Sequence, residues 1–198
     1  MKPERAEITG IVLAGGQGRR MGNVDKGFVD LAGRPLVAHV IARLAPQVAT
    51  LVINANRNAE RYAEFGYPVV ADTVGGYAGP LAGLHAGLAA AKTAFVVTSP
   101  CDSPFLPTDL VNRLAAAFDA RSIDLAVART FDQPHPVFAL ARRSLLPHLA
   151  RFLESGGRKI DAWYATLPTA EVVFDDEADA FRNINTPADL AQGAASHG

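Results

Sequence analysis

Short apolar runs alternate with segments of helical periodicity along the first two thirds of the chain. The first run, residues 8–14, is rich in β-branched residues and is followed by glycines, which is typical of a strand buried on both faces of a parallel sheet. Pro35 then opens a stretch in which apolar residues recur every three to four positions, and this pattern predicts a helix that ends near Pro46. The same alternation predicts strands at residues 49–53, 68–71, 94–97 and 123–128 and helices at residues 59–64, 79–92 and 107–118.

The last third of the chain has a less regular pattern. It predicts extended segments at residues 136–140 and 171–174, helices at residues 143–153 and 159–167, and a terminal helix that Pro187 opens and that frays from Gln192 onward. Strands that alternate with helices imply parallel crossover connections. We therefore expect an α/β fold, a three-layer α/β/α sandwich with a mostly parallel, Rossmann-like sheet. Such sheets bind ligands at the carboxyl ends of their strands.

The composition narrows the class of protein. With 198 residues, of which 49% are hydrophobic and 20% charged, the chain can bury a sizeable core, and a single domain over 1–198 is expected. The formal net charge of −1 provides no broad positive surface, so neither nucleic acid nor a membrane is expected as a partner. The lone Cys101 allows no intramolecular disulfide, and no apolar run has the length of a signal-peptide core or a membrane span. A cytoplasmic location is therefore expected.

A glycine-rich stretch with three cations follows the first expected strand. Within residues 13–26, the glycines let backbone N–H groups surround a phosphate, while Arg19, Arg20 and Lys26 can neutralise its charge. A dinucleotide fingerprint would require glycine where Met21 stands, and a Walker loop would require Gly-Lys-Ser/Thr around Lys26. A tight turn with solvated basic residues is the alternative, but three cations so close to the strand favour phosphate binding.

Asp102 is the candidate metal ligand. It follows the expected strand at residues 94–97 between two prolines, so its carboxylate should point rigidly from the carboxyl edge of the sheet. Mg²⁺ needs few protein carboxylates when phosphate oxygens and water complete its coordination shell. A structural Asx-turn before Ser103 is the alternative. The neighbouring Cys101 is expected to be packed rather than nucleophilic, because the sequence shows no evident histidine partner.

Eight motifs along the chain carry a resemblance to a known family. They are Leu-Ala-Gly-Gly at 13–16, Arg-Met-Gly at 20–22, Asp-Lys-Gly at 25–27, Gly-Arg-Pro-Leu at 33–36, Ile-Asn-Ala-Asn-Arg at 53–57, Gly-Pro-Leu-Ala-Gly at 79–83, Pro-Cys-Asp-Ser-Pro at 100–104 and Asn-Ile-Asn-Thr-Pro at 183–187. In this order the motifs resemble the molybdenum cofactor guanylyltransferases, the MobA family of nucleotidyltransferases. The resemblance implies transfer of GMP from GTP to the phosphate of molybdopterin, with Mg²⁺ and release of pyrophosphate. Transient contacts with other proteins of molybdenum cofactor biosynthesis, or with acceptor proteins, are expected as well.

The resemblance also implies roles for individual residues. It divides the chain into a nucleotide half, about 1–105, an acceptor half, about 106–191, and a tail at 192–198. Guanine and its nucleoside would contact backbone groups or side chains of Leu13, Ala14, Gly15, Gly16, Asn54 and Asp72. The triphosphate would be held by the catalytic residues Arg20, Lys26 and Asp102, with Asp102 as the metal ligand. Molybdopterin would be bound by His135, Asn183 and Asn185.

Several of these positions have a structural alternative. Asn54 can cap a strand, and His135 can be a solvent-facing loop histidine. Asn185 or Thr186 can cap the terminal helix, and for Thr186 capping is the favoured role. Residues 156–159 form a flexible basic stretch that would suit either an anionic acceptor or a solvated helix start.

The implied reaction is an in-line displacement that needs no covalent intermediate and no general base, because the acceptor phosphate is already anionic near neutral pH. GTP is expected to be preferred, since Gly15 leaves room for a purine and Asp72 can accept hydrogen bonds from guanine. Three alternatives remain: a CTP-using molybdopterin transferase, a sugar-phosphate or cobalamin-pathway nucleotidyltransferase, and a nucleotide-binding adaptor without turnover.

Overall fold

Seven strands form one central sheet in the computed structural model, which describes residues 1–14, 25–75, 79–120 and 122–195. The strands are β1 (Ile8–Leu13), β4 (Thr50–Asn54), β5 (Val69–Val70), β6 (Phe95–Pro100), β7 (Leu125–Thr130), β8 (Gln133–Arg142) and β9 (Thr169–Val173). Their spatial order is β5-β4-β1-β6-β8-β7-β9. All neighbouring pairs are parallel except the two that contain β8, which runs antiparallel to both β6 and β7. The expected mostly parallel sheet is confirmed.

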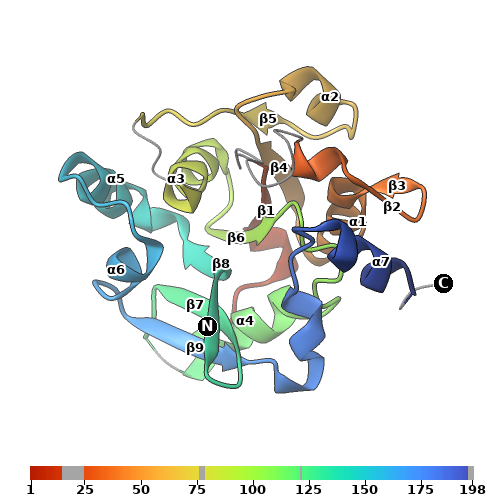
Figure 1. Ribbon diagram of the computed structural model, residues 1–198. Helices are drawn as coiled ribbons and strands as arrows, with labels where there is room; N and C mark the ends of the chain where they lie inside the picture. The colour runs from red at the N-terminus through yellow and green to blue at the C-terminus, as the bar shows by residue number, and fades with distance from the viewer. Residues whose placement is uncertain (15–24, 76–78, 121, 196–198) are drawn as a thin grey trace.

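Two layers of helices cover the sheet (Figure 1). One layer contains α1 (Leu36–Leu44) and α4 (Leu110–Ala120), whose apolar side chains share a core cluster with Val12 of β1. The other contains α3 (Pro80–Ala90), α5 (Leu146–Glu154) and α6 (Ile160–Tyr164), which pack with Ile11 of β1. Adjacent residues of a strand point to opposite faces, so one strand supplies both clusters. The expected three-layer sandwich is therefore confirmed.

The remaining elements are short. They are α2 (Ala59–Ala63), α7 (Pro187–Ala195) and the 3-10 segments η1 (Arg5–Glu7), η3 (Lys26–Phe28), η4 (Ala45–Gln47), η5 (Arg143–Leu145) and η6 (Asp175–Phe181). A separate hairpin joins β2 (Asp30–Leu31) to β3 (Arg34–Pro35) through Ala32 and Gly33, whose φ angles are 54° and 78°. Two consecutive positive φ angles are the geometry of a tight two-residue hairpin turn. Within the described part of the chain, no helix is long and apolar enough to cross a membrane.

The last third of the chain differs from the sequence-based expectation in its boundaries. β8 is longer than the expected segment 136–140, because it pairs with a strand on each side. The helix expected at 143–153 begins with the 3-10 turn η5, and the helix expected at 159–167 is limited to the five residues of α6. The β2–β3 hairpin was not predicted, because strands of two residues are too short to show a period. η6 was not predicted either, because it consists of 3-10 turns interrupted by a kink at Glu177 and so has no regular helical period.

Two glycines let α3 approach the sheet closely. Gly87 lies against Ile11, and a Cβ atom at this position would collide with that side chain. Gly83 lies against the side chains of Leu13 and Asn54, and a Cβ atom there would collide with both. Such contacts cannot take an extra carbon without a shift of the neighbours. Gly83 therefore lets α3 lie close to the carboxyl ends of β1 and β4, and Gly87 lets it lie close to the middle of β1.

Candidate active site

The carboxyl ends of four neighbouring parallel strands bring the nucleotide-side candidates together. β1, β4, β5 and β6 end at or just before Leu13 and Ala14, Asn54, Asp72 and Asp102, respectively. Backbone hydrogen bonds continue past the strand ends, because the N–H of Ala14 donates to the carbonyl of Asn54 at 2.8 Å and the N–H of Cys101 donates to the carbonyl of Leu13 at 3.0 Å. The edge of the sheet is thus an ordered platform for these residues.

Lys26 contacts one residue that follows β6 and one residue that precedes α7. Its ammonium lies 3.1 Å from Oδ2 of Asp102 and also donates a hydrogen bond to Oδ1 of Asn185. The side chains of Lys26 and Asp102 are 24% and 11% exposed, so solvent screens their attraction less than that of a surface pair. The structure therefore joins a cation, a carboxylate and an amide from three distant segments of the chain in one cluster, here called the Lys26 cluster.

Asp25 anchors the chain directly before Lys26. Its Oδ1 accepts hydrogen bonds from the N–H of Gly27 at 3.2 Å and from the hydroxyl of Tyr62 at 2.6 Å, and its Oδ2 accepts from Nδ2 of Asn58 at 2.9 Å. Burial raises the pKa of the Tyr62 hydroxyl, so this group stays protonated and donates. The sequence showed Asp25 only as part of a motif, because its partners Asn58, directly before α2, and Tyr62, on α2, come close only in the folded chain.

The C-terminal segment is tied to the loop that follows β6. The N–H of Ile184 donates to the carbonyl of Asp102 at 2.8 Å, and the hydroxyl of Ser103 donates to Oδ1 of Asn183 at 2.5 Å. Ile184 is buried in a small apolar cluster with Leu31, Leu36 and Phe105. These contacts fix the chain next to Asn185 so that its side chain lies beside Lys26.

Thr186 caps the N-terminus of α7, as expected from the sequence. The N–H of Asp189 donates to Oγ1 of Thr186 at 3.2 Å, while the carboxylate of Asp189 accepts from the N–H groups of Asn185 and Thr186, each at 2.8 Å. The bond from Asn185 and those from Thr186 lower the pKa of Asp189. The capping role of Thr186 is confirmed, and the side chain of Asn185 remains available to Lys26.

Asn54 and Asp72 form a second polar group at the edge of the sheet. Asn54 is buried and donates through Nδ2 to the carbonyl of Val70 at 3.2 Å and to Oδ1 of Asp72 at 2.9 Å. Oδ2 of Asp72 accepts from Nδ2 of Asn56 at 2.7 Å. Asn54 thus links the ends of β4 and β5 and orients Asp72. Each carboxylate oxygen of Asp72 can accept a further hydrogen bond.

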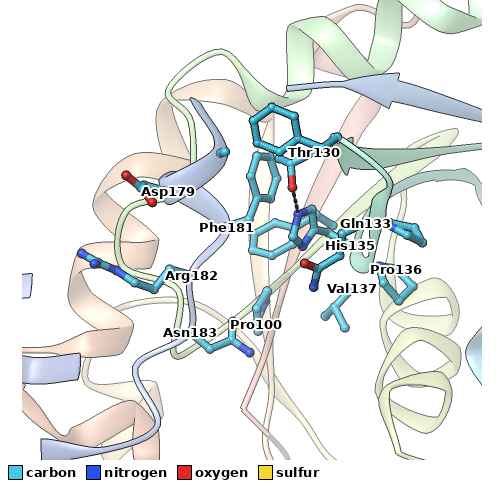
Figure 2. A pocket seen from close by; sticks show the side chains of 14 residues that line it. Pro100, Thr130, Gln133, His135, Pro136, Val137, Asp179, Phe181, Arg182 and Asn183 are labelled. Carbon is cyan, nitrogen blue, oxygen red and sulfur yellow. Dashed lines mark hydrogen bonds between the residues drawn. The ribbon is translucent and has the colours of Figure 1, made fainter. Parts of the chain in front are cut away.

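A cavity of about 530 Å³ lies between the β7–β8 hairpin and η6 (Figure 2). His135 lines it, with its ring stacked on Phe181 at a centroid distance of 4.6 Å and its Nε2 at 2.7 Å from Oγ1 of Thr130. Burial lowers the pKa of His135, so the imidazole is neutral at neutral pH. His135 is half-buried in β8, and the alternative of a solvent-facing loop histidine is wrong.

The remaining candidate residues lie outside the described part of the chain or have structural roles. Gly15, Gly16 and Arg20 lie outside the described residues. Arg158 donates to the carbonyls of Leu153 and Gly157, each at 2.7 Å, so it binds the C-terminal end of α5. Cys101 is buried, and burial raises the pKa of its thiol, as expected for a packed residue.

The Lys26 cluster has the donor chemistry of a magnesium site. No group of three or more His, Cys, Asp or Glu side chains among the described residues is arranged to hold a metal ion. Asp102 and Asn185 instead offer one carboxylate and one amide oxygen, and both already accept from the ammonium of Lys26. Hard oxygen donors of this kind suit Mg²⁺ when phosphate and water complete its coordination. The residues present therefore fit a magnesium–triphosphate complex.

Sequence comparison identifies relatives along most of the chain. The model of the MobA-like NTP transferase domain matches residues 10–169. The molybdenum cofactor guanylyltransferase of Cupriavidus necator is 54% identical over 191 residues, which cover 94% of this chain and 96% of that protein. The protein of the same name from Burkholderia vietnamiensis is 54% identical over 193 residues, which cover 93% of this chain and 94% of that protein.

Solved structures show the same architecture. Molybdopterin-guanine dinucleotide biosynthesis protein A from Archaeoglobus fulgidus has a TM-score of 0.78 and 28% identity, over 95% of this chain and 97% of that chain. The 4-diphosphocytidyl-2C-methyl-D-erythritol synthase of Anaerococcus prevotii has a TM-score of 0.74 at 13% identity, over 96% of each chain. The second likeness shows a shared fold alone.

Proposed function

The chain belongs to the family of MobA-like NTP transferase domains, and from this premise we propose that it transfers GMP from GTP to the phosphate of molybdopterin. The products are molybdopterin guanine dinucleotide and pyrophosphate. Relatives named molybdenum cofactor guanylyltransferase, at 54% identity over nearly the whole chain, support this substrate pair.

The observation that carries the proposal is the Lys26 cluster at the carboxyl edge of the sheet. A phosphoryl transfer between two anionic substrates requires positive charge at the point where they meet. Lys26 lies between Asp102, which follows β6, and Asn185, which belongs to the acceptor half. In the proposed arrangement this one ammonium lies where the two substrates meet, and its contacts with both residues support a reaction centre here.

The reaction is an in-line displacement. An oxygen of the molybdopterin phosphate attacks the α-phosphorus of GTP, and the bond from that phosphorus to the oxygen of pyrophosphate breaks. Lys26 neutralises charge that builds on the phosphoryl oxygens, and Arg20, in the glycine-rich part of the sequence, would hold the triphosphate. Mg²⁺ held by Asp102 would supply further positive charge to the triphosphate. The acceptor is already anionic, so positioning and electrostatic stabilisation suffice.

Guanine selection is assigned to Asp72 and to the backbone of Leu13, Ala14, Gly15 and Gly16. Asn54 and Asn56 each donate one hydrogen bond to the carboxylate of Asp72, which fixes its orientation. The remaining lone pairs can accept from N1–H and the amino group of guanine, whereas adenine has no N1–H donor. The absence of a Cβ atom at Gly15 leaves room for a purine.

Product analysis tests the proposed function. Purified protein is incubated with GTP and molybdopterin, with and without Mg²⁺, under anaerobic conditions because the acceptor is oxygen-labile. We expect equal amounts of pyrophosphate and a guanine dinucleotide, formed only with the metal. Intact GTP beside an acceptor that a known guanylyltransferase can use would overturn the proposal.

A further inference from the structure

We propose that the cavity between the β7–β8 hairpin and η6 binds the flat heterocycle of the acceptor, with His135 as the side chain on which this ring stacks. The inference rests on the proposed function, in which the acceptor carries a pterin. It goes further, because it assigns the ring and the phosphate of that substrate to different places in the fold.

The cavity lies next to the Lys26 cluster along the chain. Pro100 lines the cavity and lies two residues before Asp102. Asn183 lines it as well, bonds to Ser103, and lies two residues before Asn185. The cavity therefore borders two of the three segments that build the Lys26 cluster, those of Asp102 and Asn185. A ligand whose ring occupies the cavity can place its phosphate at Lys26.

The wall of the cavity is rigid and aromatic. His135 and Phe181 are nearly parallel, with 14° between their planes. Phe138 and Phe174 pack edge-on against Phe181, at centroid distances of 4.9 and 5.1 Å. The hydrogen bond to Thr130 fixes the rotation of the His135 ring. Flat ligands gain most from stacking on rings that are already held in place.

The charge of the cavity favours a neutral ring over a phosphate. Of the described residues that line it, the charged ones are Asp179 and Arg182, and Figure 2 shows their charged groups directed away from His135. The guanidinium of Arg182 instead lies 5.1 Å from the ring centre of Phe105. Gln133 and Asn183 provide amide donors and acceptors, which match the 2-amino-4-oxo edge of a pterin.

Binding of 6-hydroxymethylpterin, a fluorescent ring without a phosphate, tests the assignment. The titration contains saturating GTP, because pterin and guanine share an edge and the nucleotide site must be blocked. We expect His135→Ala to weaken pterin binding roughly tenfold or more, as loss of a stacking side chain does, and His135→Phe to weaken it less than about threefold. Ala178→Trp, which fills the cavity from η6, should abolish binding. Val173→Ala, outside the cavity on β9, serves as the control with unchanged binding.

Thermal unfolding of each variant and its affinity for GTP are measured in parallel. Equal pterin affinity in wild type, His135→Ala and Ala178→Trp would overturn the assignment, and so would the absence of pterin binding to wild type. Either result leaves the proposed function intact if GTP and molybdopterin still yield the dinucleotide. Failure to form that product contradicts the proposed function itself, whatever the result with the pterin.

Discussion

Asp102 contributes to the site through two chemically different groups. Its carboxylate pairs with Lys26, and its backbone carbonyl accepts from Ile184. Asp102→Asn keeps the size and the backbone contact but removes the charge. We expect turnover with Mg²⁺ to fall roughly a hundredfold or more, since one preorganised charge contact to a transition state is worth about 3 kcal/mol. Pyrophosphate release measures the rate, and Asp119→Asn on the exposed side of α4 is the control. Near-normal turnover in Asp102→Asn would remove Asp102 from the metal site.

His135 gives a prediction for stability against pH. Burial lowers the pKa of His135 in the folded state below that of the unfolded chain. On acidification below about pH 6.5 the unfolded chain therefore binds the proton first, and the free energy of unfolding decreases. Denaturant titrations at pH 7.5 and pH 5.5 should show a smaller decrease in His135→Phe than in wild type. Identical decreases would mean that His135 titrates alike in the folded and unfolded states.

Among the elements, α3 is placed by its glycines, which provide a matched pair of variants. In Gly83→Ala the new methyl group meets Asn54 and Leu13 at the site, whereas in Gly87→Ala it meets Ile11 in the core. Overpacking of this kind costs about 1–3 kcal/mol, so both variants should be less stable. Only Gly83→Ala should also weaken GTP binding, because Asn54 orients Asp72. Calorimetric titration with GTP checks this, and equal affinities in the two variants would contradict the role of Asn54.

At the scale of the whole molecule, the apolar pattern was sufficient to predict the three layers, because strands and helices with buried faces repeat along the chain. It was insufficient to predict that β8 is antiparallel and pairs with β6, since pairing depends on the whole sheet. The phosphate and metal candidates followed from local chemistry at Lys26 and Asp102. Their contact with Asn185, 159 residues beyond Lys26, depends on the path of the folded chain. The resemblance implied roles for Asp102 and for Asn185, but it did not imply that the ammonium of Lys26 contacts both side chains.

The central claim, transfer of a guanine nucleotide to molybdopterin, is tested most directly by competition among nucleotides. GTP, ATP and CTP are supplied at equal concentrations with Mg²⁺ and molybdopterin, and the dinucleotide product is identified. A mispaired buried polar group costs about 1–3 kcal/mol, so each unpaired group should disfavour a nucleotide by roughly five- to a hundredfold. We predict that the guanine dinucleotide dominates. A dominant cytosine dinucleotide would contradict the account of guanine selection at Asp72 and Gly15, and the absence of any dinucleotide would contradict the proposed reaction.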